Sequence, residues 1–178
     1  MDCISSGIGV WKVFYLLGEP ALPFKLPYRH LMNEDAVSEA KISSADLLNA
    51  MIGFGLRSEA WTDEEFDMAY ELQPKYLKLS VYDIAALAIA KCRHIVLLTD
   101  DMALREAAKT EEVTVKGTLK ILDELFISRI IAPWKYRQCL VRLLSMNGQE
   151  VRMPEIELIA RIERTSNSDE EATIIYCS

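Results

Sequence analysis

Two adjacent acids are the residues of this chain best suited to chemistry. Asp100 and Asp101 follow the apolar run of residues 94–98, which has the length of a strand buried on both faces. Neighbouring carboxylates at the end of a buried strand repel each other, and a hard divalent cation with oxygen ligands is the usual solution. The alternative is a simple helix cap, because Asp is a favoured N-cap and a helix is expected from Met102. The local sequence leaves both interpretations open.

Asp83 is the second candidate. Ser80 and Asp83 form a capping box at the start of a helix, which by itself explains both polar side chains. An acid in the first turn of one helix, followed by a strand that ends in two more acids, can nevertheless converge on one cleft. Ligands of doubly wound sheets collect at the carboxyl ends of the strands. We therefore treat Asp83 as either a cap or a site residue.

The elements around these acids alternate regularly. The pattern predicts a helix that opens at residues 79–83, a strand at 94–98, a helix at 102–109, a strand at 113–115 and a helix at 119–127. A further helix follows Pro133 and covers residues 133–146. Short connections between alternating strands and helices are typical of right-handed βαβ units around a parallel sheet. The expected fold class is therefore α/β.

The flanking segments give weaker patterns. A helix is expected from Ser44 to the glycines at 53 and 55, and a capping box at residues 62–65 starts another, so the two are predicted to form a helical hairpin. Residues 155–164 read as a helix after Pro154. Residues 165–171 have the composition of an exposed or disordered segment. Residues 173–176 would form an edge strand or a partner-binding tail.

Length and composition limit the class of protein. The chain has 178 residues, enough for one domain with a hydrophobic core. No apolar run approaches the roughly 18–20 residues of a membrane span. The N-terminal stretch opens with an acid and lacks a basic region and a cleavage site, so a cytoplasmic location is expected. The cysteines at 3, 92, 139 and 177 form no C-x-x-C pair, which indicates reduced core residues rather than a zinc site.

The charge is unevenly distributed. A net charge of −7 argues against nonspecific nucleic-acid binding by the surface as a whole. Residues 79–145 contain ten Lys and Arg against eight Asp and Glu, so the acidic excess lies elsewhere. The more neutral part of the chain is where we place the chemistry.

Two of these stretches resemble a known family. Residues 79–88 (LSVYDIAALA) and 97–105 (LLTDDMALR) resemble the third and fourth motifs of PIN-domain proteins. Residues 113–119 and Leu122-Asp123 resemble the next segment of the subset related to VapC-like toxin ribonucleases. The resemblance covers residues 79–155 well and the first 78 loosely. It implies a three-layer α/β/α sandwich with a central parallel sheet, and three or four acids around Mg²⁺ or Mn²⁺ that hydrolyse RNA.

The resemblance also assigns residues. Asp83 matches the helix-start acid of the family, Asp101 matches the acid two residues after the threonine, and Asp100 shares or replaces that role. Asp2 would be the acid that ends the first strand, although only Met1 precedes it, and Glu39 would be the second acid, on a helix. Glu34 and Asp35 compete with Glu39 for this role. The catalytic and metal-binding set expected is therefore Asp2, Glu39, Asp83, Asp100 and Asp101.

The function expected from this resemblance is a divalent-metal-dependent ribonuclease. Residues 1–150 would be the nuclease domain, and residues 151–178 a C-terminal helix and tail. The enzyme would be the toxin of a toxin–antitoxin pair, with RNA as substrate, an antitoxin protein as partner and a homodimer as its assembly. Apolar residues near both ends of the chain would suit the dimer interface: Trp11, Phe14, Tyr15, Ile174, Ile175 and Tyr176.

Two alternatives remain. A catalytically degenerate PIN-like domain would serve as a binding or scaffold module, which the short start and the net acidity favour. In the other, Asp100 and Asp101 would be the acidic pair of a flavodoxin-like receiver. This hypothesis is the weaker one, because a phosphoacceptor Asp and a later Lys are not evident at suitable positions.

Overall fold

A computed structural model describes the backbone of residues 1–176 and the side chains of residues 1–165. The chain forms two compact units, Met1–Ile121 and Leu122–Ser178. The domain boundary expected after residue 150 stays a prediction. In the described part of the chain, none of the helices is both long and apolar enough to cross a bilayer.

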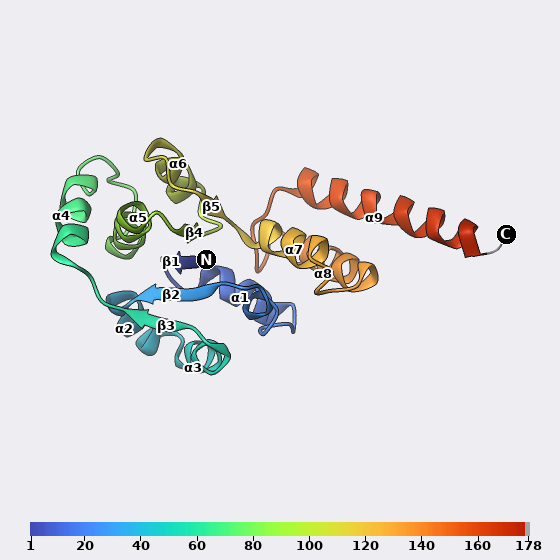
Figure 1. Ribbon diagram of the computed structural model, residues 1–178, viewed down its shortest axis with the longest axis horizontal. Helices are drawn as coiled ribbons and strands as arrows, with labels where there is room; N and C mark the ends of the chain where they lie inside the picture. Colours follow the sequence, from blue (N-terminus) through green and yellow to red (C-terminus); the bar gives the residue numbers. More distant parts are fainter. Residues whose placement is uncertain (177–178) are drawn as a thin grey trace. The chain divides into compact units, whose positions relative to one another are not determined.

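The first unit is built on a parallel sheet. In the described residues the sheet has five strands in the order β3-β2-β1-β4-β5 (Figure 1). All neighbouring pairs are parallel, so the carboxyl ends of the strands share one edge. The central strand aligns Ile4 with Leu31 on one side and Leu97 on the other. The strands are β1 (Asp2–Ser5), β2 (Arg29–Asn33), β3 (Arg57–Glu59), β4 (Val96–Leu98) and β5 (Val115–Lys116).

Helices cover both faces of this sheet. Ile4, Leu31 and Leu97 share one buried cluster with residues of α4 (Asp63–Leu72), α5 (Val81–Arg93) and α6 (Met102–Thr110). On the other face, Trp11 of α1 (Gly9–Leu16) donates a hydrogen bond to Ser5, 3.1 Å away. α1 contacts α3 (Ala45–Phe54), which follows α2 (Glu34–Ser43); a short 3₁₀ turn, η1 (Pro23–Lys25), lies between α1 and β2. The predicted three-layer α/β/α sandwich is confirmed.

A buried Cys–His pair lies on the α1 face. The Cys3 thiol and His30 Nδ1 are 3.2 Å apart, and both residues are almost fully buried. His30 Nε2 lies 3.1 Å from the carbonyl oxygen of Pro23. A carbonyl can only accept, so Nε2 carries the proton and Nδ1 is an acceptor; the Cys3 thiol lies within reach of Nδ1 and of the Arg29 carbonyl oxygen, 3.7 Å away. Burial lowers the pKa of His30 to about 4, so the imidazole is neutral near pH 7.

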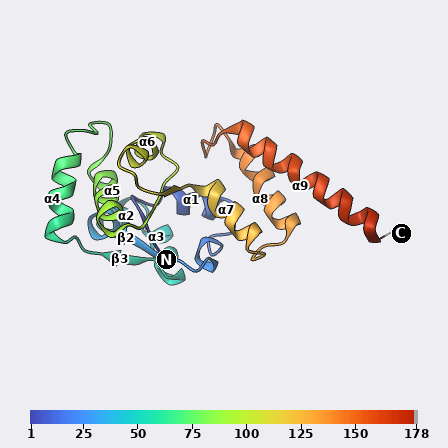
Figure 2. The ribbon, with the colours of Figure 1, turned by 45° about the horizontal axis from the view of Figure 1, so that its top comes forward.

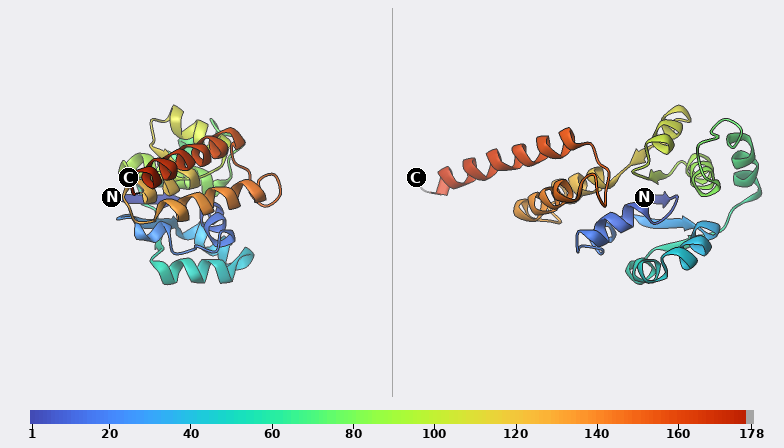
Figure 3. Two further views of the ribbon diagram at one scale, coloured as in Figure 1. Left: turned by 90° about the vertical axis from the view of Figure 1, so that its right-hand side faces the viewer. Right: turned by 180° about the vertical axis from the view of Figure 1, so that it is seen from behind.

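The second unit contains the later part of α7 (Thr118–Ile127) with α8 (Pro133–Met146) and α9 (Glu155–Tyr176). α8 and α9 lie side by side (Figures 2 and 3). Asp123 of α7 accepts hydrogen bonds from the Tyr136 hydroxyl, at 2.6 Å, and from Arg161, at 2.9 Å. Burial and the neighbouring Asp123 carboxylate raise the pKa of Tyr136. One carboxylate therefore links all three helices.

Most elements predicted after residue 79 are confirmed, and three earlier expectations are wrong. β3 lies between α3 and α4 and pairs with β2, so these helices form no hairpin. The backbone of residues 173–176 continues α9, so the edge strand expected there is absent. Trp11 and Phe14 are fully buried in the core, so they are not interface residues. The side chains of residues 174–176, and Cys177, lie outside the described residues.

Candidate active site at the carboxyl edge of the sheet

The topology places several acids at one edge of the sheet. α2 follows β2 and α6 follows β4, so both helices begin where the strands end. α5 ends three residues before β4 begins, so its first turn, about 20 Å from its last, also lies toward the carboxyl edge. This edge is where parallel sheets bind ligands. The acids it receives include Glu34, Asp35, Glu39, Asp83, Asp100 and Asp101, and also Glu59 at the end of β3, which pairs with Arg93.

Asp83 and Asp101 each cap a helix with one oxygen. Asp83 Oδ2 accepts hydrogen bonds from the Ser80 N–H, at 3.1 Å, and the Ser80 hydroxyl, at 2.7 Å. Asp101 Oδ1 accepts from the Leu104 N–H at 2.8 Å, and its own N–H donates to Thr99. Among the described residues, nothing hydrogen-bonds to Asp83 Oδ1 or Asp101 Oδ2. Each capping carboxylate therefore keeps one oxygen available for a ligand.

Asp100 is engaged through both oxygens. Oδ1 accepts from the backbone N–H of Thr118 at 2.8 Å, and Oδ2 accepts from the Thr118 hydroxyl. Thr118 is fully buried at the start of α7. Asp100 thus ties the end of β4 to the start of α7, and its role in the fold is established independently of any ion.

The Asp100–Thr118 contact requires a residue without a side chain at position 117. A Cβ atom there would overlap Asp100 Oδ1 and would lie 2.8 Å from Arg105 Nη1 and 3.2 Å from the Thr99 carbonyl oxygen. We expect Gly117→Ala to lower the free energy of unfolding by about 1–3 kcal/mol, because overpacking displaces hydrogen-bonded groups. Urea denaturation measures the change.

Gly53→Ala provides the matched control. Gly53 lies inside α3, and a Cβ atom added there would have nothing within 4 Å, so alanine should stabilise the protein by about 0.5–1 kcal/mol. A Gly117→Ala protein as stable as the native chain would show that the Asp100–Thr118 contact tolerates displacement.

Asp2 lies at the opposite edge. The expectation that it ends the first strand is wrong, because β1 begins at Asp2 and runs to Ser5. The Asp2 carboxylate pairs with Arg29 at the start of β2. At the carboxyl end, the buried Ser5 hydroxyl accepts the hydrogen bond from Trp11. β1 therefore brings a serine, and no acid, to the edge where the other acids lie.

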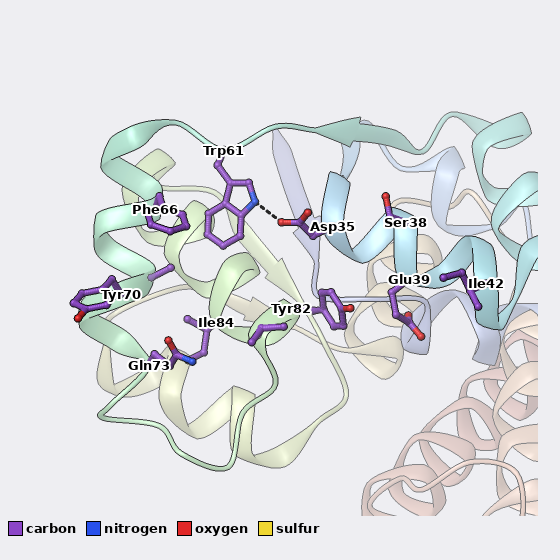
Figure 4. Close-up of a pocket in the computed structure, with 12 residues that line it drawn as sticks. Asp35, Ser38, Glu39, Ile42, Trp61, Phe66, Tyr70, Gln73, Tyr82 and Ile84 are labelled. Atoms are coloured by element: carbon purple, nitrogen blue, oxygen red, sulfur yellow. Dashed lines mark hydrogen bonds between the residues drawn. The ribbon is translucent and has the colours of Figure 1, made fainter.

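Glu39 lies in a groove beside this edge. The groove has a volume of about 590 Å³ and lies between α2, α4 and the first turn of α5 (Figure 4). Asp35 Oδ2 accepts a hydrogen bond from Trp61 Nε1 at 2.8 Å. Most other lining side chains are apolar or aromatic. Sequence reasoning missed these residues, although the outward-facing apolar pair Phe66 and Tyr70, spaced i, i+4 on an acidic helix, is a signal that could have revealed them.

The acids share an edge without forming a dense cluster. In residues whose side chains the structure describes, no three His, Cys, Asp or Glu side chains lie close enough together to hold one ion. The assignment of Asp2, Glu39, Asp83, Asp100 and Asp101 as metal ligands stays a prediction.

Comparison with known proteins identifies the family. The family model DUF3368, described as a PIN domain, matches residues 37–166, more than half of the chain. The chain belongs to the PIN-domain family. A PilT N-terminus domain protein from the hyperthermophilic archaeon Sulfolobus solfataricus P2 has a similar fold, with a TM-score of 0.52 and 20% identity over 70% of this chain and 92% of that chain. No curated protein matches the sequence.

The family match gives this PIN domain a nuclease-type fold. The matched residues include Glu39, Asp83, Asp100 and Asp101 but begin after Asp2. PIN domains in general use divalent metal ions. The donors at this edge are all carboxylate oxygens, which suit Mg²⁺ or Mn²⁺, and Mg²⁺ commonly binds through one or two carboxylates plus water. The available oxygens of Asp83 and Asp101 are therefore donors of the kind that such an ion takes, whereas Asp100 has both oxygens engaged.

Proposed function

We propose that this PIN domain is a divalent-metal-dependent endoribonuclease, with Asp83 and Asp101 as the principal ligands of Mg²⁺ or Mn²⁺ and Glu39 as a further carboxylate. One observation carries the proposal. α5 and α6 both begin at the carboxyl edge with a capping carboxylate that keeps one oxygen available. Caps fix the orientation of both side chains, as a preorganised site requires.

The protein's own residues hold and orient these ligands. Ser80 fixes the Asp83 carboxylate through two hydrogen bonds, and the Leu104 N–H fixes Asp101. A bound divalent ion lowers the pKa of a water molecule and neutralises charge on the scissile phosphate. Such chemistry needs no histidine. His30 is buried toward the amino edge, and His94 is the C-cap of α5 at the far end of that helix.

An RNA cleavage assay tests the proposal. Asp83→Asn and Asp101→Asn keep a side-chain oxygen for capping but remove the negative charge. We expect native protein to cleave single-stranded RNA with Mn²⁺ and not with EDTA, and each variant to lose about 100-fold or more in rate. Asp46→Asn, at the start of α3, is the control and should cleave like the native chain. Equal rates in EDTA and Mn²⁺, or unimpaired variants, would contradict the proposal.

A second candidate function is a protein-binding module, which the groove favours. Ile42, Phe66 and Tyr70 line the groove and are 91%, 60% and 75% exposed. The charged lining residues, Asp35 and Glu39, are both acids. The groove therefore complements a segment with apolar and basic side chains. Native protein that neither binds Mn²⁺ nor cleaves RNA would support this function over the first.

The same groove is where we propose that an antitoxin partner would bind. A toxin of a toxin–antitoxin pair would be inhibited by an antitoxin segment that covers Glu39 and the neighbouring edge. We also propose a homodimer, whose mass light scattering would measure in solution. Neither partner is required for the metal-binding test.

A further inference from the structure

A second pocket opens at the amino edge of the sheet, away from the acids of the candidate active site. It has a volume of about 450 Å³ and is lined where β1, β2 and β3 begin and where α3 ends. That volume lies within the range of pockets that hold small molecules, roughly 300–1,000 Å³. The pocket belongs entirely to the first unit.

Aromatic rings form one wall of the amino-edge pocket. The ring centroids of Phe24 and Phe54 are 5.9 Å apart. Phe24 also stacks on the buried Trp11, with ring centroids 5.1 Å apart. The buried rings of Trp11 and His30 contact each other, and both pack against Phe24. Phe54 is 42% exposed, so part of its ring surface faces solvent. A partly exposed ring that packs against Phe24 is a suitable platform for a planar aromatic ligand.

Two guanidinium groups form the polar wall. Arg29 begins β2, and Arg57 begins the edge strand β3 opposite Leu31. Asp2, the acidic side chain of the lining, pairs with Arg29 and holds it. The Arg57 side chain is exposed and makes no hydrogen bond or ion pair with the other described residues, although its backbone pairs with β2. Its planar donors are therefore available to a phosphate, which guanidinium groups bind in a bidentate manner.

A further cation stands beside the same wall. Lys116 donates a hydrogen bond to the Tyr28 hydroxyl at 2.7 Å and lies 4.7 Å from the centre of the Tyr28 ring. Tyr28 lines the pocket, but this ammonium occupies one face of its ring. Stacking therefore falls to Phe54, and Arg57 is the lining guanidinium that Asp2 does not pair with.

We propose that the amino-edge pocket binds a nucleoside phosphate, with the base against Phe54 and the phosphate on Arg57. The aromatic wall and the free guanidinium supply the two kinds of contact that such a ligand requires. A free nucleotide and the terminal nucleotide of an RNA share this chemistry. The pocket is independent of the proposed nuclease site, because it uses neither Asp83 nor Asp101.

Calorimetric titration in EDTA tests this inference without metal-dependent cleavage. We expect a nucleoside monophosphate to bind the full chain with a Kd on the order of 10–1,000 μM, and the unphosphorylated nucleoside and inorganic phosphate to bind at least about tenfold more weakly. Arg57→Gln and Phe54→Leu should each raise Kd about tenfold. A short RNA that binds with the same dependence on Arg57 would identify an RNA terminus as the source, and binding of the mononucleotide alone would identify a free nucleotide.

The Asp83→Asn, Asp101→Asn double variant is the control and should bind nucleotide like the native chain. This control separates the two sites, so loss of nuclease activity would leave the pocket intact. Absence of saturation up to about 5 mM nucleotide, or an Arg57→Gln protein with unchanged Kd, would overturn the inference.

Discussion

Replacing Arg93 with methionine is expected to lower the free energy of unfolding by about 3–5 kcal/mol, because it leaves a buried carboxylate without its cation. Arg93, at the end of α5, donates to both carboxylate oxygens of Glu65 and to Glu59 Oε1 at 2.7 Å. The Glu65 side chain is only 2% exposed. Burial alone would raise the pKa of Glu65, but the hydrogen bonds from Arg93 and from the Thr62 N–H outweigh it and lower that pKa. The carboxylate is therefore charged in the core.

Urea denaturation of the native and Arg93→Met proteins measures this effect. Arg57→Met is the matched control, since the Arg57 side chain is exposed and has no partner among the described residues, and it should change stability by no more than about 0.5 kcal/mol. Adding Glu65→Gln to Arg93→Met should restore part of the loss, because glutamine is neutral and can still accept the hydrogen bond from the Thr62 N–H. A loss below about 1 kcal/mol would mean that water replaces Arg93 at this site.

The second large effect is a loss of stability in mild acid caused by His30. Its pKa falls from an ordinary value near 6.5 to about 4 in the folded protein, chiefly through burial. Between these values the unfolded chain binds a proton that the folded chain does not, so protonation favours unfolding. The stability associated with neutral His30 is therefore complete above pH 6.5 and is lost as the pH falls through 4. The complete loss in the free energy of unfolding amounts to about 3 kcal/mol.

The pH dependence of urea denaturation, compared between native protein and His30→Gln, isolates this contribution. The variant is expected to be less stable at pH 7, because glutamine fits the Cys3 and Pro23 contacts poorly, but to lose less stability between pH 6.5 and 4. His94→Asn serves as the control, since asparagine tolerates the left-handed backbone at that position and leaves the Cys3 and Pro23 contacts of His30 in place. Parallel curves for native and His30→Gln proteins would show that His30 titrates normally.

Local signals allowed much of the fold to be predicted from sequence. The Ser80–Asp83 and Thr62–Glu65 capping boxes depend on residues three apart, and both are present. β3 could not be predicted, because Arg57–Glu59 contains no apolar residue and owes its strand conformation to pairing with β2. The resemblance places Asp2 at the end of the first strand. The strand instead begins at Asp2, and Met1 alone precedes it, so no apolar run before Asp2 could mark where the strand starts.

The candidate site depended more on distant contacts. Asp100 looked like a free carboxylate, yet its partner Thr118 lies eighteen residues further along the chain. The groove near Glu39 forms only when α2, α4 and α5 come together. Sequence spacing brings Asp83, Asp100 and Asp101 to this edge, but it could not show which of their oxygens the fold already uses, and the resemblance wrongly adds Asp2.

Calorimetric titration of Mn²⁺ tests the proposed metal site most directly. The native chain and the Asp83→Asn, Asp101→Asn variant would be compared at neutral pH, with urea denaturation showing that both are folded. We expect saturable binding by the native chain and at least about tenfold weaker binding by the variant. Equal affinities in the two proteins, or no binding in either, would contradict the proposal and would leave both aspartates as helix caps alone.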